Sequence, residues 1–256
     1  MQHGGMALNG AARSARAARL MAWAVHLYTA SGAVLALLAL DAIGRDAYAA
    51  AFGWMALAMF IDCTDGTLAR RARVKEILPN YDGSKLDDII DYLNYVLVPI
   101  VLCYRASLLP PGIVGLVVAA LPLLASAYGF CVSEAKTPDH FFTGFPSYWN
   151  VVVLYLFVLG WSRWTNAAVL VVLSVLVFVP IRYLYASRTT TARAVTYIGG
   201  ALWGLSVFWL LLQFPTPSRT LARLSLLYPA YYVALSLWLH WRTPPSPRHM
   251  PEQASG

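Results

Sequence analysis

Four aspartates stand at two regular spacings in a chain that is otherwise poor in charge. Asp62 and Asp65 are three residues apart, and Asp87 and Asp91 are four residues apart. Residues three or four apart on an α-helix share one face, so each pair presents two carboxylates in the same direction. Two such faces opposed would form an oxygen-rich site for hard divalent cations. The spacing therefore predicts a metal site between two helices.

Small residues and one arginine accompany these acids at helical spacing. Gly66, Ala69 and Gly83 would let a bulky ligand approach the backbone, and Arg70 lies about two turns beyond the first acid. A guanidinium beside a metal site suits a diphosphate, whose oxygens the metal would bridge. One carboxylate near an acceptor hydroxyl would accept its proton, and Asp91, on the innermost turn, is the expected base.

The composition predicts an integral membrane protein. The 256-residue sequence is 59% hydrophobic and only 12% charged. Apolar runs close to the roughly 20 residues that a bilayer crossing needs recur from Leu20 to Trp241. This content excludes an ordinary soluble domain and makes acids within the apolar runs functional candidates. The three cysteines have neither disulfide nor zinc-site spacing, and no nucleic-acid-binding motif is present.

The apolar runs predict an all-α, polytopic membrane bundle of about eight helices, separated by proline and glycine clusters. Their expected spans are 20–41, 47–70, 84–105, 112–133, 147–161, 164–186, 193–213 and 221–241. Basic residues concentrate at the N-terminus, at 70–75, at 182–193 and in the C-terminal tail. The positive-inside rule then places both termini and the aspartates at the cytoplasmic face.

Three segments follow from this pattern. Residues 1–19 are basic and acid-free, which predicts a segment lying on the membrane interface. Residues 20–243 form the membrane domain, and the polar, proline-rich tail 244–256 is expected to be disordered. Gly200 and Gly204 make a small-residue pattern that suits either a homodimer or helix packing within one chain.

The acid pattern resembles the signature of the CDP-alcohol phosphatidyltransferases, a family of membrane enzymes. That signature reads D-x2-D-G-x2-A-R, a spacer, then G-x3-D-x3-D. All of its fixed positions are present, over about 30 residues: Asp62, Asp65, Gly66, Ala69, Arg70, Gly83, Asp87 and Asp91. The spacer 71–82 has twelve residues where the family usually has eight. This longer spacer and the segments 24–26, 29–32 and 144–150 are similar to the bacterial phosphatidylcholine synthases within the family.

The resemblance implies a reaction and its ligands. CDP-diacylglycerol and choline would give phosphatidylcholine and CMP in a bacterial inner membrane, with a homodimer as the expected assembly. The four signature aspartates would hold two divalent ions, Mn²⁺ or Mg²⁺, and Asp91 would also be the base for the choline hydroxyl. Gly66, Ala69 and Gly83 would pack on the cytidine nucleotide, and Arg70 would meet its phosphate.

Choline carries a quaternary ammonium group, which aromatic faces and a carboxylate recognise. Candidates near the expected cytoplasmic helix ends are Tyr28, Tyr92, Tyr95, Tyr148, Trp149, Tyr185 and Glu134. Aromatic residues near helix ends are also the ordinary interfacial anchors of membrane proteins.

Other interpretations stay open at this point. The same donor would serve another acceptor such as serine, inositol phosphate or glycerol phosphate, and Arg182, Arg188 and Arg193 would suit an acceptor phosphate. CDP-choline and diacylglycerol are an alternative substrate pair. A cation transporter would also use intramembrane acids, but transport does not account for the glycines, the alanine and the arginine at fixed spacing.

Overall fold

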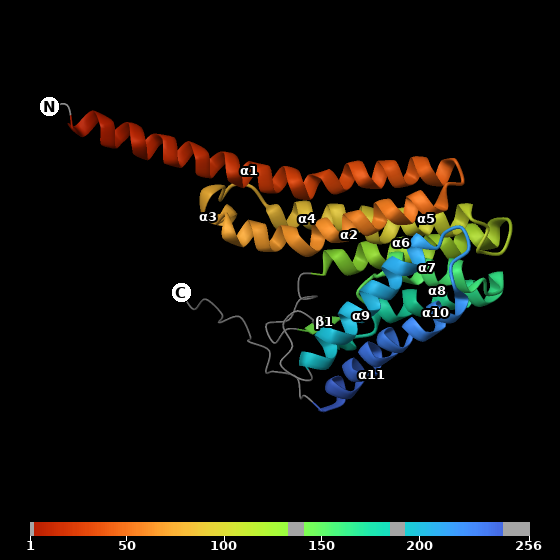
Figure 1. The fold of residues 1–256 in the computed structure, drawn as a ribbon. Coiled ribbons are helices and arrows are strands. Elements are labelled where there is room, and N and C mark those ends of the chain that lie inside the picture. Colours follow the sequence, from red (N-terminus) through yellow and green to blue (C-terminus); the bar gives the residue numbers. More distant parts are fainter. Residues whose placement is uncertain (1–2, 133–140, 185–192, 243–256) are drawn as a thin grey trace, which may run out of the picture.

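The computed structural model describes residues 3–132, 141–184 and 193–242. The chain forms a bundle of helices lying side by side, and the N-terminal helix extends beyond the others at one end (Figure 1). The helices are α1 (His3–Gly44), α2 (Tyr48–Arg71), α3 (Val74–Ile77), α4 (Gly83–Asp91), η1 (Tyr92–Leu97), α5 (Val98–Arg105), α6 (Ile113–Cys131), α7 (Trp149–Leu159), α8 (Arg163–Phe178), α9 (Arg193–Leu212), α10 (Arg219–Ser225) and α11 (Leu227–Arg242). Two short strands, β1 (Phe141–Thr143) and β2 (Arg182–Leu184), pair antiparallel.

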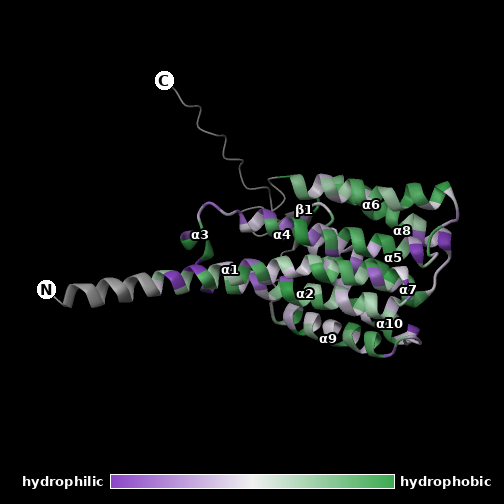
Figure 2. Cartoon of the chain, turned by 90° about the horizontal axis from the view of Figure 1, so that it is seen from above, coloured by the Kyte–Doolittle hydropathy of each residue, from purple (hydrophilic) through white to green (hydrophobic). Residues whose placement is uncertain are grey.

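The helical membrane class expected from the composition is confirmed. Within the described residues, three helical stretches are long and apolar enough to cross a membrane: Ser14–Gly44, Ile113–Cys131 and Ala194–Leu212. The helices α7 and α8 are apolar but shorter. Hydrophobic residues cover most of the bundle, and hydrophilic residues gather around α3 and α4 and toward helix ends (Figure 2). The number of eight crossings stays a prediction.

One predicted helix ends earlier than expected. The span 164–186 was expected to be helical throughout, but α8 ends at Phe178 and Val179 is extended with ψ of 123°. Strand β2 follows at Arg182–Leu184. Pro180 explains the error, because proline disfavours helical geometry in the residue before it and has no backbone N–H to donate. Residues 185 and 186 lie outside the described part of the chain.

The structure describes the predicted N-terminal segment from His3 onward but not the predicted C-terminal tail. From His3 onward, the basic N-terminal segment is part of α1, which continues without a break to Gly44. Its position on a membrane interface stays a prediction. The tail 244–256 lies outside the described residues.

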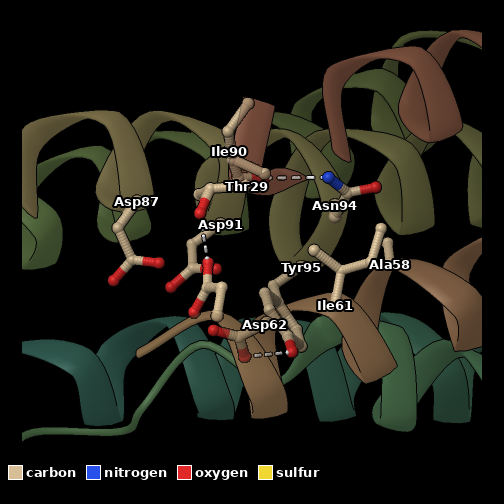
Figure 3. A pocket seen from close by; sticks show the side chains of 10 residues that line it. Thr29, Ala58, Ile61, Asp62, Asp87, Ile90, Asp91, Asn94 and Tyr95 are labelled. Atoms are coloured by element: carbon tan, nitrogen blue, oxygen red, sulfur yellow. Dashed lines mark hydrogen bonds between the residues drawn. The ribbon is translucent and has the colours of Figure 1, made fainter. Parts of the chain in front are cut away.

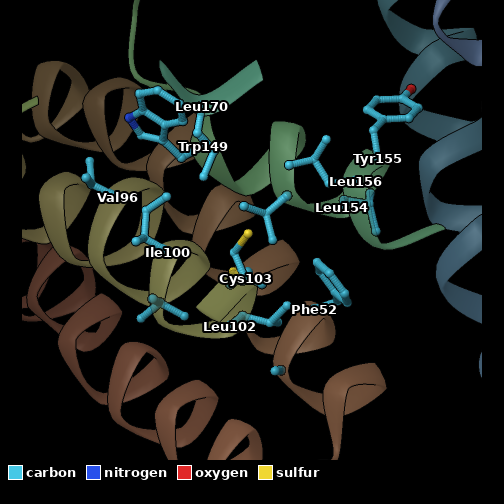
Figure 4. Close-up of a cluster of buried hydrophobic side chains, with 14 of the residues drawn as sticks. Phe52, Val96, Ile100, Leu102, Cys103, Trp149, Leu154, Tyr155, Leu156 and Leu170 are labelled. Carbon is cyan, nitrogen blue, oxygen red and sulfur yellow. The ribbon is translucent and has the colours of Figure 1, made fainter. Parts of the chain in front are cut away.

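The main hydrophobic core holds the middle of the bundle together (Figure 4). Trp149, Leu102, Leu156 and Leu170 are fully buried in it. Apolar burial of this kind fixes η1 and α5, which directly follow the second pair of aspartates, against α7 and α1.

Gly32 lets α1 approach α4, the helix that carries the second acid pair. A Cβ atom added at Gly32 would lie 2.5 Å from Cγ2 of Ile90, a distance that real Cβ contacts do not reach. Asn94, one turn further along, donates from Nδ2 to the carbonyl oxygen of Gly32 at 3.0 Å. A residue without a side chain is therefore needed at this crossing.

We expect Gly32→Ala to lower the free energy of unfolding by about 1–3 kcal/mol, because the added methyl group overlaps Ile90. Thermal unfolding of the detergent-solubilised protein measures the change. Gly53→Ala in α2 is the matched control, since no atom lies within 4 Å of its added Cβ. Equal melting temperatures for the two variants would contradict the close crossing.

Candidate active site

The structure brings three of the four aspartates together between α2 and α4. Asp62, Asp87 and Asp91 each place a carboxylate oxygen within 4.8 Å of the other two, and all three are half-buried. Figure 3 shows their side chains converging on one space. This is the arrangement that two opposed helical faces were expected to make, and we call these three residues the acid cluster.

Asp65 lies in the same cavity as the acid cluster but has a different environment. Its side chain is buried, and Oδ2 accepts a 2.7 Å hydrogen bond from Oγ1 of Thr29 on α1. Thr29 also lines the cavity. The sequence analysis gave Thr29 no role in the site, although it lies in the segment 29–32 that carries part of the family resemblance.

Tyr95 connects the acid cluster to an irregular turn of helix. Its hydroxyl donates to Oδ2 of Asp62 at 2.7 Å (Figure 3). Tyr95 lies in η1, a π-helical turn that directly follows Asp91. Because a π-turn is wider than an α-turn, it changes which side chains face the neighbouring helices, and such turns occur often at functional sites. No sequence pattern predicted this turn.

The donor set fits a divalent cation. Carboxylate oxygens are the ligands that hard divalent ions prefer in proteins. Three ionised carboxylates within 4.8 Å would repel one another strongly in an apolar bundle, and a bound cation removes that repulsion. The hydrogen bonds from Thr29 and Tyr95 orient two of the site's carboxylates, as outer partners do in metal sites.

The first half of the signature continues along α2 with Gly66, Ala69 and Arg70. Gly66 is half-buried, and the position of an added Cβ there lies 3.4 Å from Nη1 of Arg70. The Arg70 side chain is exposed and donates from Nη2 to Oγ1 of Thr67 at 3.0 Å. Ala69 instead packs on a small apolar cluster between α1 and α3. An exposed guanidinium thus lies beside a glycine at this end of α2, where it can pair with an anion.

Gly83 begins α4 and has a packing role of its own. A Cβ added there would lie 2.7 Å from Cε1 of His26 on α1. The His26 ring is buried, and its centroid lies 4.3 Å from the ring centroid of Tyr81. Tyr81 belongs to the spacer between the two motif halves. Asp82 caps α4 by accepting two backbone N–H groups of its first turn. The long spacer is therefore docked on α1 immediately before the second acid pair.

Three of the residues suggested for choline have hydrogen-bond partners other than the acid cluster. The Tyr28 hydroxyl is hydrogen-bonded to Oγ1 of Thr64 at 2.8 Å. Tyr92 donates to a carbonyl oxygen of α6 at 3.0 Å. Trp149 is fully buried in the core, and its indole donates to Oγ of Ser126 at 2.7 Å. Trp149 thus has no ring face open to a ligand.

Two of the suggested aromatic residues do lie together at the site. The rings of Tyr95 and Tyr148 are in edge-to-face contact, with centroids 6.5 Å apart. Tyr95 is 9% exposed and Tyr148 is 41% exposed. The two remaining suggestions, Tyr185 and Glu134, lie outside the described residues.

Comparisons with known proteins find one family model and several relatives. A family model described as CDP-alcohol phosphatidyltransferase matches residues 19–181. A phosphatidylcholine synthase of Legionella pneumophila is 41% identical over 224 residues, which cover 85% of this chain and 88% of the relative. A phosphatidylcholine synthase of Pseudomonas aeruginosa is 40% identical over 85% of this chain and 91% of the relative. One of Borreliella burgdorferi is 32% identical over 88% of this chain and 96% of the relative. The family match includes all the motif residues and the segment before α7.

We expect Tyr95→Phe to weaken Mn²⁺ binding about tenfold, because Asp62 loses the hydroxyl that orients its carboxylate. Titration of free Mn²⁺ by electron paramagnetic resonance measures binding without relying on turnover. Tyr155→Phe is the matched control, since Tyr155 is also buried and hydrogen-bonded but its partners are Ser225 and Trp203. Equal Mn²⁺ affinity in both variants would show that the Tyr95 bond does not support the metal site.

Proposed function

The chain belongs to the CDP-alcohol phosphatidyltransferase family, and we propose that it transfers the phosphatidyl group of CDP-diacylglycerol to choline, giving phosphatidylcholine and CMP. Members of this family are membrane enzymes that depend on divalent metal ions. The observation that carries the proposal is the acid cluster, formed by motif aspartates in a chain about 40% identical to phosphatidylcholine synthases over most of its length.

In this proposal Asp62, Asp87 and Asp91 hold the divalent cation, and Asp65 completes a site for two ions, Mn²⁺ or Mg²⁺. When bound, the ions neutralise charge on the diphosphate oxygens of the donor. Thr29 and Tyr95 keep two of the carboxylates in fixed orientations, so that little reorganisation is needed when the donor binds.

The remaining motif residues would bind the donor nucleotide. Arg70 is exposed beside Gly66 and would pair with a phosphate of the CDP group. Gly66 has no side chain, so a nucleotide can approach α2 closely beside Arg70. Gly83 packs against His26 on the side where a side chain would lie, so its proposed contact with the nucleotide would come from its backbone at the start of α4. Ala69 would contribute through its small size, since a larger side chain would disturb the apolar cluster against which it packs.

Asp91 is the proposed general base. The choline hydroxyl gives its proton to the Asp91 carboxylate while the choline oxygen forms a bond to the phosphatidyl phosphorus. The bond from that phosphorus to the bridging oxygen breaks, and CMP leaves with the electron pair. A carboxylate on the innermost turn of α4 is suited to this step, because the diphosphate would occupy the outer turns near Gly83 and Arg70.

The site is proposed to face the cytoplasm of a bacterial inner membrane. Exposed basic residues surround the end of the bundle that carries the motif: Arg71, Arg73, Lys75 and Lys85. The positive-inside rule places such an end on the cytoplasmic side. For the proposed homodimer, α9 offers the open position of Gly204, whereas Gly200 packs against Tyr228 of the same chain.

We expect the purified protein in detergent to release CMP from CDP-diacylglycerol and Mn²⁺ only when choline is present, and to stop when the metal is chelated. Phosphatidylcholine should appear in the lipid extract in equal amount. Serine, inositol phosphate and glycerol phosphate are the acceptor controls. Release with one of these and not with choline would keep the family assignment and overturn the proposed acceptor.

We expect Asp91→Asn to lower kcat by at least about a hundredfold while the protein stays folded, because the amide cannot accept the choline proton. Turnover of CMP and the melting temperature are measured together. Asp88→Asn is the matched control, since Asp88 is the neighbouring acid on α4 and is not part of the acid cluster. Full activity in Asp91→Asn would exclude it as the base.

A further inference from the structure

One exposed aromatic ring contacts the acid cluster through a single intermediate residue. Tyr95 donates to Asp62 at 2.7 Å, and the ring of Tyr148 lies against the ring of Tyr95 at 6.5 Å between centroids. Tyr95 is nearly buried, with its hydroxyl engaged, whereas 41% of Tyr148 is exposed. Tyr148 is thus the more exposed residue of this pair, and one ring contact separates it from the residue that is bonded to Asp62.

The backbone around Tyr148 is held on both sides. Ser147 is buried and has φ of +55°, a left-handed conformation that non-glycine residues rarely adopt. Its Oγ donates to Oγ of Ser126 at 2.9 Å, and the fully buried Trp149 donates to the same oxygen at 2.7 Å. Strained backbone of this kind persists only where its surroundings hold it, and it concentrates at functional sites. The exposed ring is therefore preorganised between two buried anchors.

Other described aromatic residues near the motif lack this combination. Tyr28 and Tyr92 are half-buried, and their hydroxyls bond to Thr64 and to a carbonyl oxygen of α6, not to the acid cluster. Trp23 and Tyr81 are partly exposed, but their rings pack on each other and on His26 beside the basic end of α2 and α4. A cation is disfavoured beside those arginines and lysines.

This placement and the chemistry of choline fit each other. A trimethylammonium group has no N–H to donate, so its recognition depends on an aromatic face and on nearby negative charge. Tyr148 supplies the face, and Tyr95, which contacts the Tyr148 ring, is hydrogen-bonded to the Asp62 carboxylate. Resting on the proposed function, we propose that the Tyr148 ring binds the trimethylammonium group of choline and so directs its hydroxyl toward Asp91. The donor nucleotide and choline would then reach the acid cluster from different sides.

The test compares choline with dimethylbutanol, its uncharged carbon isostere, as acceptors. For Tyr148→Leu we expect the KM for choline to rise about 2- to 30-fold, the range of a cation–π contact, while the KM for CDP-diacylglycerol stays unchanged. The preference for choline over dimethylbutanol should fall by the same factor. Tyr148→Phe, which keeps a ring face, should recover most of that preference. Tyr104→Leu is the matched control, because Tyr104 is 43% exposed and lies in the last turn of α5, thirteen residues after Asp91.

Each outcome bears on one conclusion. An unchanged choline KM and an unchanged preference in Tyr148→Leu overturn the inference and leave the proposed function intact. A wild-type enzyme that uses choline no better than dimethylbutanol overturns it without any variant. Absence of choline turnover by the wild type overturns the proposed function and this inference with it. Should the leucine variant not fold, Tyr148→Met removes the ring at similar volume and gives the same readout.

Discussion

Close approach of carboxylates inside an apolar bundle is the constraint on which the rest of this structure depends. Two like charges 4 Å apart repel by about 4 kcal/mol even at an effective dielectric constant of about 20. The acid cluster holds three carboxylates within 4.8 Å, and Asp65 lies in the same cavity. Hydrogen-bond donors together with a bound cation or a proton offset such repulsion, and packing prevents the helices from separating.

The compensating groups come from distant parts of the chain. Thr29 is 36 residues from Asp65, and Tyr95 is 33 residues from Asp62. Both contacts need α1, α2 and η1 at fixed separations. Two features fix these separations: α1 crosses α4 closely at Gly32, and η1 and α5 are anchored in the core. Apolar packing thereby determines the geometry of a polar site.

Two anchored segments pack against residues of the helices that line the cavity. The long spacer is docked on α1, where the Tyr81 ring meets His26 just before Gly83. On the other side, Ser147 and Trp149 share the hydroxyl of Ser126 and fix Tyr148 beside Tyr95. These two segments are also where the chain resembles the choline-using members of its family. Their anchoring holds both segments against helices that line the cavity, α1 and η1.

The sequence by itself determined the membrane class, the pairing of acids on helical faces and the family, because hydropathy and helical period are local properties of the chain. It could not decide that Thr29 and the Tyr95 hydroxyl would support the carboxylates, since both depend on long-range contacts and on a π-turn without a sequence signal. Two neighbouring aromatic residues show most clearly what the sequence could not decide. Tyr148 and Trp149 looked equivalent in the sequence, yet one is exposed at the site and the other is fully buried. Only the tertiary structure made that distinction, because the left-handed turn at Ser147 and the hydroxyl of Ser126 set which ring enters the core.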